Sequence, residues 1–168
     1  MTVKEAIEKR RSIRKYQSRG IEPEVLNEVL MAGVKAPSAK NLQNWKFIAV
    51  TDKSLMGEMQ KACLNQPCMG SAPAAIAVCA TEETFMNCKQ SRATVDCSIA
   101  LSFMMLRATE LGLGTVWLGA FDAGEVKKVL NLPENYIPIA VTPIGYPDEE
   151  PEARPRKDFS EVVLFNRQ

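Results

Sequence analysis

The 168-residue chain contains no histidine. Serine–histidine and cysteine–histidine nucleophiles are therefore excluded, and so is most zinc chemistry, because imidazole supplies the base or the metal ligand in such sites. A reaction at this chain must depend on a cofactor, on carboxylate or lysine side chains, or on backbone groups. We assign no side chain as a catalytic acid or base, and we expect no metal site.

Paired cysteines, an apolar leader and an excess of one charge are also missing. The five cysteines are odd in number and form no Cys-x-x-Cys pair, which favours reduced thiols. The N-terminus lacks the apolar core of a signal peptide. The net charge of +1 indicates neither a nucleic-acid nor a membrane surface. We expect a cytoplasmic protein with no nucleic-acid partner and no membrane partner.

The length indicates one domain spanning residues 1–168. Capping residues, prolines and apolar residues at helical spacing predict helices at 2–10, 23–36, 55–63, 93–111 and 122–130. Apolar runs predict strands at 46–51, 74–80, 115–118 and 137–144, with a strand-like piece at 162–165 and a loop through 67–70. Helices that alternate with four short strands indicate an α+β or α/β sandwich.

The predicted helix at 93–111 is the most apolar segment of the chain. Between Ile99 and Leu106 only Ser102 is polar, so this helix has almost no polar face. Its apolar run is too short, and too closely flanked by charged residues, to span a bilayer. Such a helix is central in its domain, lies at a subunit interface, or does both.

Arginines gather near both ends of the chain. Apolar residues of the first helix recur at Val3, Ala6 and Ile7, and the next position at this spacing is Arg10, which we therefore expect on the inward side. A guanidinium group suits a carboxylate or a phosphate. The clusters at 10–14 and 154–157 can converge on one phosphate, although either cluster alone is typical of a solvated surface.

Four motifs occur in a fixed order: RRSIR at 10–14, APSAKNLQNWKF at 36–47, GLGTVWLGAF at 112–121 and RPRK at 154–157. In this order and spacing the chain resembles the FMN-dependent nitroreductase family over nearly its whole length. The resemblance implies an α+β sandwich with a mixed sheet flanked by helices. It also implies a long central helix at the interface of a homodimer, and a C-terminal segment that crosses to the partner's sheet.

The resemblance also implies site residues. The flavin phosphate and ribityl chain would be held by Arg10, Arg11, Ser12, Arg14, Arg154 and Arg156. A loop with Pro37, Ser38, Asn41 and Gln43 would reach the flavin of the other subunit. Leu118, Gly119 and Ala120 would lie beside the flavin N5 atom. Candidates for the substrate pocket are Phe85, Met86, Met69 and Trp117, although core packing is favoured for each of them.

The function implied by the resemblance is reduction of nitro compounds, quinones or similar electron-poor small molecules by NADH or NADPH through bound FMN. We expect ping-pong turnover, because a domain of this size without a dinucleotide-binding unit offers one pocket to donor and acceptor in turn. Two alternatives remain open. One is an FMN-binding carrier or sensor without pyridine-nucleotide turnover, and the other is a dimerisation module without a cofactor.

Overall fold

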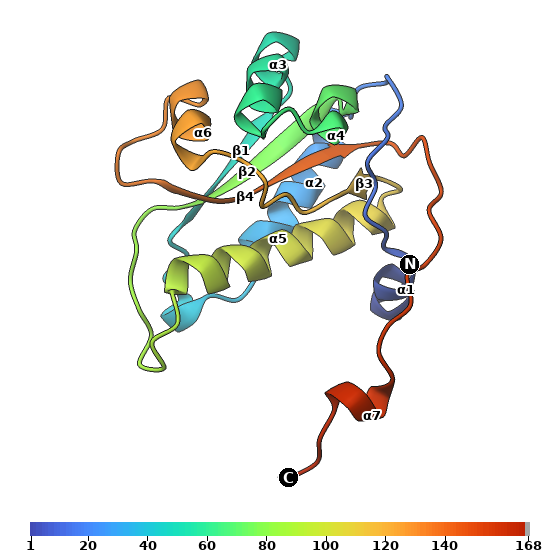
Figure 1. Cartoon of the computed structure of the whole chain (residues 1–168), viewed down its shortest axis with the longest axis vertical. Coiled ribbons are helices and arrows are strands. Elements are labelled where there is room, and N and C mark those ends of the chain that lie inside the picture. The colour runs from blue at the N-terminus through green and yellow to red at the C-terminus, as the bar shows by residue number, and fades with distance from the viewer. Residues whose placement is uncertain (167–168) are drawn as a thin grey trace.

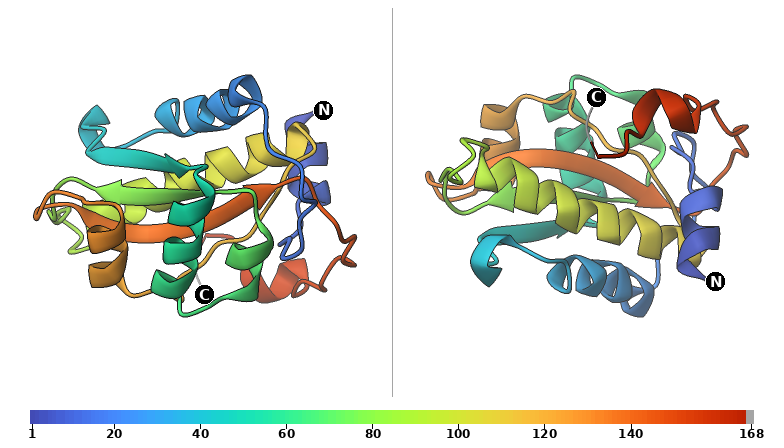
Figure 2. Two further views of the ribbon diagram at one scale, coloured as in Figure 1. Left: turned by 90° about the horizontal axis from the view of Figure 1, so that it is seen from above. Right: turned by 90° about the horizontal axis from the view of Figure 1, so that it is seen from below.

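The computed structural model describes residues 1–166 (Figure 1). Its helices are α1 Val3–Lys9, α2 Pro23–Val34, α3 Lys53–Ala62, α4 Pro67–Ser71, α5 Arg92–Glu110, α6 Ala123–Val129 and α7 Phe159–Val162, with a 3₁₀ turn η1 at Ala39–Asn41. Its strands are β1 Trp45–Val50, β2 Ala74–Ala80, β3 Gly114–Thr115 and β4 Ile137–Gly145. The expected α+β sandwich is confirmed: α2 and α5 cover one face of the sheet, and α3, α4 and α6 cover the other (Figure 2).

The four strands form one sheet in the order β1-β2-β4-β3. Each of the three strand pairs is antiparallel. The expectation of a mixed sheet is therefore wrong for the described strands. Parallel pairing occurs there as one isolated bridge, between Ser12 and Thr115. This bridge matters for the site, because it holds the arginine-rich N-terminal segment against the sheet.

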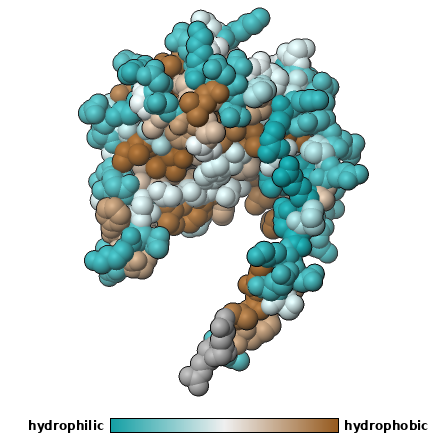
Figure 3. Space-filling view, in the orientation of Figure 1, coloured by the Kyte–Doolittle hydropathy of each residue, from teal (hydrophilic) through white to brown (hydrophobic). Residues whose placement is uncertain are grey.

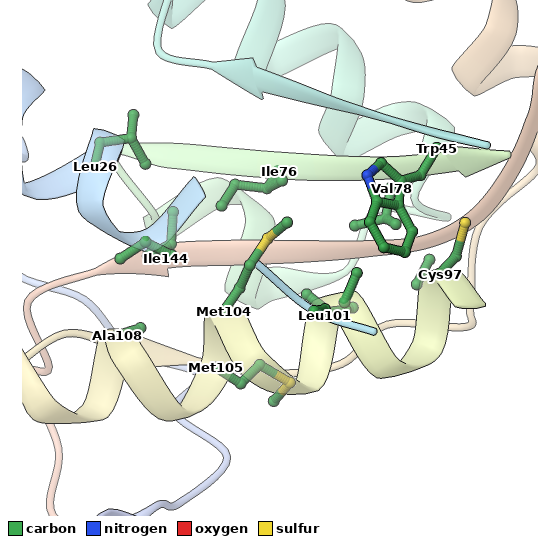
Figure 4. Packing of buried hydrophobic residues seen from close by; sticks show 14 of the residues in the cluster. Leu26, Trp45, Ile76, Val78, Cys97, Leu101, Met104, Met105, Ala108 and Ile144 are labelled. Carbon is green, nitrogen blue, oxygen red and sulfur yellow. The ribbon is translucent and has the colours of Figure 1, made fainter. Parts of the chain in front are cut away.

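Strand β2 is buried along its whole length and separates two apolar cores. Because successive side chains of a strand point to opposite faces, Ile76 and Val78 pack toward α2 and α5, while Ala75, Ala77 and Cys79 pack toward α3, α4 and α6. Figure 4 shows the first of these cores, in which Leu101 and Met104 of α5 lie under the sheet. This continuous apolar run is why the sequence predicts β2 correctly.

Helix α5 confirms the predicted long central helix. Its inward face is buried through residues at helical spacing, among them Cys97, Leu101 and Met104. Its outward face carries polar residues such as Ser102 and also the apolar Phe103, which is 42% exposed. Over residues 1–166, no helix is both long enough and apolar enough to cross a membrane.

Strand β4 contains two prolines although it is an inner strand. Pro138 pairs with Cys79 where the register shifts. Val141 exchanges backbone hydrogen bonds with Leu118 (2.9 and 3.3 Å). Alternation along the strand turns the nitrogen of Pro143 to that same side. On that side Val116 and Trp117 belong to no strand. The absence of an N–H group at Pro143 therefore costs the sheet no hydrogen bond.

Several sequence expectations are wrong in detail. Residues 67–71 form the helix α4, where a loop was expected, because a proline is well tolerated in the first turn of a helix. The strand expected at 115–118 shortens to β3. The strand expected at 162–165 is absent, because Val162 ends α7 and residues 163–165 belong to no helix or strand. Val3 and Ile7 of α1 are 74% and 60% exposed, so Ala6 alone of the expected stripe is buried.

Candidate functional site

A cavity of about 170 Å³ lies between the two arginine clusters. Five guanidinium-bearing residues and one hydroxyl-bearing residue line it, together with a short acidic and proline-containing stretch. The lining residues are Arg10, Arg11, Ser12, Arg14, Pro151, Glu152, Ala153, Arg154 and Arg156. The structure thus brings together six of the predicted site residues from opposite ends of the chain.

Two extended segments bring the clusters together. Residues 12–17 lie between β3 and the chain that leaves β4, with isolated bridges from Ser12 to Thr115 and from Tyr16 to Pro147. Asp148 N–H donates to the Lys15 carbonyl (2.9 Å), and the Glu149 carboxylate accepts from the backbone N–H groups of Arg14 and Lys15. These contacts turn residues 150–156 back over the end of α1.

The buried side chain of Tyr16 holds the segment 10–14 in place. Its hydroxyl donates to the Ile13 carbonyl (2.6 Å) and lies 3.3 Å from the Pro143 carbonyl. The side chain is buried, and this burial raises the pKa of Tyr16 above its ordinary value, so the hydroxyl stays protonated and remains a donor. The buried tyrosine therefore fixes the backbone that carries Ser12 and Arg14.

The five arginines of the cavity have no acidic partner among residues 1–166. Each of the seven ion pairs of this part of the chain involves other groups. Arg11 and Arg156 donate only to backbone carbonyls, at 2.6 to 3.3 Å. Arg107, by contrast, pairs with Glu28 and Glu110. Glu152 lines the cavity but forms no ion pair with these arginines within residues 1–166. Clustered guanidinium groups that are not paired with carboxylates repel one another, and a bound phosphate relieves this repulsion.

A second cavity of about 370 Å³ adjoins the first and shares Arg10 and Ser12 with it. Its other lining residues are Ser102, Met105, Leu106 and Trp117. Trp117 is 36% exposed, so core packing is the wrong assignment for this residue. Met69 is buried in the core, and Phe85 is 64% exposed on a loop. Sequence reasoning missed the α5 side of this cavity, because Met105 and Leu106 are part of a stretch that is apolar except for Ser102.

The polar loop with Pro37, Ser38, Asn41 and Gln43 lies elsewhere. None of these four residues lines either cavity. Figure 1 shows η1 below one end of α5 and α1 beside the other end. The loop is folded tightly, with Gln43 N–H donating to Ser38 Oγ (3.1 Å) and Gln43 Nε2 donating to Asn41 Oδ1 (3.2 Å). Within one chain it does not meet the arginine cavity.

The segment after β3 presents its backbone to solvent. Leu118 is buried, and its backbone N–H and carbonyl both bond to Val141. Gly119 is exposed, and within residues 1–166 its N–H donates no hydrogen bond. A Cβ added at Gly119 meets no atom within 4 Å. Gly119 therefore offers a free amide donor that a flat ring can approach closely.

The cysteines have free thiols, and none of them lines either cavity. Cys63, Cys68, Cys79 and Cys97 are buried, and Cys88 is exposed. Burial raises the pKa of Cys63 to about 11 and the pKa of Cys79 and Cys97 to about 12. These thiols stay protonated at neutral pH and are unsuited to act as nucleophiles.

Comparison with known proteins places the chain. A family model described as the nitroreductase family matches residues 7–90 and 60–146. The chain belongs to the nitroreductase family. The resemblance that its four motifs indicated is thus confirmed, as is the α+β sandwich that the resemblance implied, although the described sheet is antiparallel and not mixed.

Individual nitroreductase relatives extend over nearly the whole chain. A Methanothermobacter thermautotrophicus protein described as an NADH dehydrogenase/NAD(P)H nitroreductase is 35% identical, covering 98% of this chain and 87% of its own. The NADPH-flavin oxidoreductase of Vibrio harveyi is 31% identical over 97% of this chain and 73% of its own. An FMN-dependent nitroreductase structure from Clostridium difficile R20291 has a TM-score of 0.83 at 32% identity, covering 96% and 98% of the two chains.

Proposed function

We propose that this protein is an NAD(P)H-dependent FMN oxidoreductase that reduces nitro compounds, quinones or similar electron-poor small molecules. The observation that carries the proposal is the cavity in which five arginines from both ends of the chain meet without an acidic partner. The relatives named for flavin, NAD(P)H and nitroreductase activity support the same chemistry. We expect residues 1–168 to form one flavin-binding domain in a cytoplasmic protein.

The donor set fits a flavin phosphate. That phosphate carries close to two negative charges, and each charge-assisted hydrogen bond contributes about 1.5–3 kcal/mol. Arg10, Arg11, Arg14, Arg154 and Arg156 supply the donors, and Ser12 adds a hydroxyl. FMN supplies the hydride chemistry when it is bound, and the protein contributes position and electrostatics. This division agrees with a chain that has no histidine.

Gly119 provides the test at the ring end of the site. Gly119→Ala adds a methyl group where this chain has open space, so we expect the folded protein to be equally stable or slightly more stable. The methyl group would occupy space that the flavin ring needs. Overpacking costs about 1–3 kcal/mol, so the affinity for FMN should fall roughly 5- to 100-fold in a fluorescence titration.

The control for this substitution is Gly20→Ala. Gly20 also has no atom within 4 Å of an added Cβ, and it lies before α2 and not in the segment that follows β3. It should leave both stability and FMN affinity unchanged. If Gly119→Ala binds FMN with the affinity of the parent protein, Gly119 does not contact the flavin ring.

A homodimer completes the proposed site. The loop at η1 is tied to Asp96, whereas the second cavity contacts α5 around Met105. At 1.5 Å of helix rise per residue, these two positions are about 14 Å apart along α5. If two α5 helices pack antiparallel about a twofold axis, the start of one helix lies beside the end of the other. Ser38 and Asn41 then reach the flavin that the partner's arginines hold.

Kinetics test whether donor and acceptor share one pocket. We expect ping-pong turnover, in which oxidised nucleotide leaves before the acceptor enters the same space beside Gly119 and Trp117. Holding each molecule in turn is the main contribution open to the protein, since no side chain is a dedicated acid or base. Initial rates at varied donor and acceptor should give parallel double-reciprocal lines. Intersecting lines would mean that both molecules bind at once.

A further inference from the structure

The tether of the polar loop is a single buried carboxylate. Asp96 of α5 is 5% exposed, and its Oδ1 and Oδ2 lie 3.1 and 3.2 Å from the backbone nitrogen of Ala39. No ion pair of residues 1–166 includes Asp96. The Ala39 N–H is its one hydrogen-bond donor in this part of the chain. Burying a carboxyl group is unfavourable unless it gains hydrogen bonds. A buried carboxyl group that accepts from a single amide therefore indicates that the position of this amide matters.

The loop that Asp96 holds has an unusual backbone. Lys40, Asn41 and Gln43 have φ values of 54°, 55° and 53°, in the left-handed region that residues with side chains seldom adopt. Such conformations persist only where the surroundings enforce them. The Gln43 bonds to Ser38 and Asn41 stiffen the loop internally, but they do not fix it to the rest of the molecule. Asp96 provides that attachment, through an amide that the first turn of η1 leaves unpaired.

We infer that Asp96 is a positioning residue. Its carboxylate holds the loop 38–43 in the position from which Ser38 and Asn41 contact the flavin ring of the partner subunit. The inference rests on the proposed function. Asp96 touches neither cavity and no reacting atom, so it acts through Ala39 alone. The two ends of the flavin then depend on different residues. The arginines bind the phosphate, and Asp96 positions the loop that contacts the ring.

This separation defines the measurement. Asp96→Ala should weaken binding of FMN and of riboflavin by the same factor, about tenfold, because both ligands share the ring. Arg156→Ala should weaken FMN binding and leave riboflavin binding unchanged, because Arg156 lines only the first cavity and riboflavin has no phosphate. Asp96→Asn keeps one acceptor oxygen for Ala39 and should restore most of the loss. Hydrogen exchange of the Ala39 amide in the flavin-free protein should quicken in Asp96→Ala, while exchange at residues 12–14 stays at the parent rate.

A control separates positioning from stability. Thr142 is 1% exposed and its hydroxyl donates to the Pro143 carbonyl (3.1 Å), so Thr142→Val also removes a buried polar group. It should lower stability without changing riboflavin affinity or the visible circular dichroism of the bound flavin. If Asp96→Ala folds poorly, the comparison passes to Asp96→Asn, whose neutral oxygen is a weaker acceptor. Asp96→Asn should retain a smaller loss of riboflavin affinity and a changed flavin dichroism, neither of which Thr142→Val should show.

Mixed dimers test the partner subunit's role. One subunit carries Asp96→Ala, and the other carries Arg10→Ala with Arg156→Ala. A loop that acts across the interface leaves one intact site in this pair, so it should bind one FMN per dimer at the parent affinity. Two weakened sites would show that the loop acts on its own subunit. Parent riboflavin affinity in both Asp96 variants would overturn the positioning role alone, whereas a parent protein that binds no flavin would overturn the proposed function itself.

Discussion

Removing Arg10 and Arg156 together should abolish tight FMN binding while leaving the protein folded. The two residues come from opposite ends of the chain and meet at one cavity. With about 1.5–3 kcal/mol for each charge-assisted hydrogen bond, each single change to alanine should weaken FMN about 10- to 100-fold. The double variant should approach the product of the two losses. Fluorescence titration of the flavin-free protein measures both affinities.

Stability distinguishes a phosphate site from a structural cluster. The arginines of the cavity repel one another when no anion is bound, so Arg10→Ala should leave the flavin-free protein as stable as the parent or more so. Arg19→Ala is the matched control, because Arg19 pairs with Glu22 and stacks on Tyr146, outside the cavity. It should leave FMN affinity unchanged. If Arg10→Ala and Arg156→Ala both bind FMN as the parent does, these residues are ordinary surface charges.

Placing a charge on the outer face of α5 should produce monomers that no longer hold flavin. Phe103 is 42% exposed there, and four apolar residues of the C-terminal segment are 61% to 74% exposed: Phe159, Val162, Leu164 and Phe165. Figure 3 shows apolar side chains on that projecting segment. Obligate interfaces bury on the order of 2,000 Å² or more and are strongly apolar. If α5 forms such an interface, Phe103→Asp would bury a charge within it.

Sedimentation at low micromolar concentration measures this effect. The parent should sediment as one species of twice the chain mass, and Phe103→Asp as a folded monomer with little bound FMN. Leu64→Asp is the control, since Leu64 is 59% exposed but lies between α3 and α4 on the opposite face. It should remain dimeric. A folded monomer that retains flavin would contradict both the dimer and the cross-subunit role of Ser38 and Asn41.

The parts that the sequence predicts well are those decided by neighbouring residues. The capping box of Thr2 and Glu5 is present at the start of α1, and the apolar run at 74–80 forms the central strand. The arginine clusters were also recognisable, because RRSIR places three guanidinium groups within five residues. That both clusters line one cavity follows from the chain's path, in which residues 147–149 bond back to residues 14–17.

The parts that the sequence does not predict depend on distant contacts. Trp117 resembles a core residue of a strand, but the strand leaves the ladder opposite Pro143, so the indole faces the second cavity. Asp96 bonds to an amide 57 residues earlier. A signal was present, since Asp96 shares a helical face with Ala93 and Ala100 and a carboxylate on a buried face needs a donor. Neighbouring residues do not indicate that this donor is the Ala39 amide, because the contact forms only in the folded chain.

An anaerobic titration of the FMN-loaded protein with NADH and with NADPH tests the proposed function most directly. The yellow flavin absorbance should bleach with one equivalent of at least one of the two nucleotides, and it should return when a quinone or a nitro compound is added. This result separates a reductase from a flavin carrier or sensor, which also binds FMN tightly. If the flavin stays oxidised with excess NADH and with excess NADPH, the protein is not an NAD(P)H-dependent oxidoreductase.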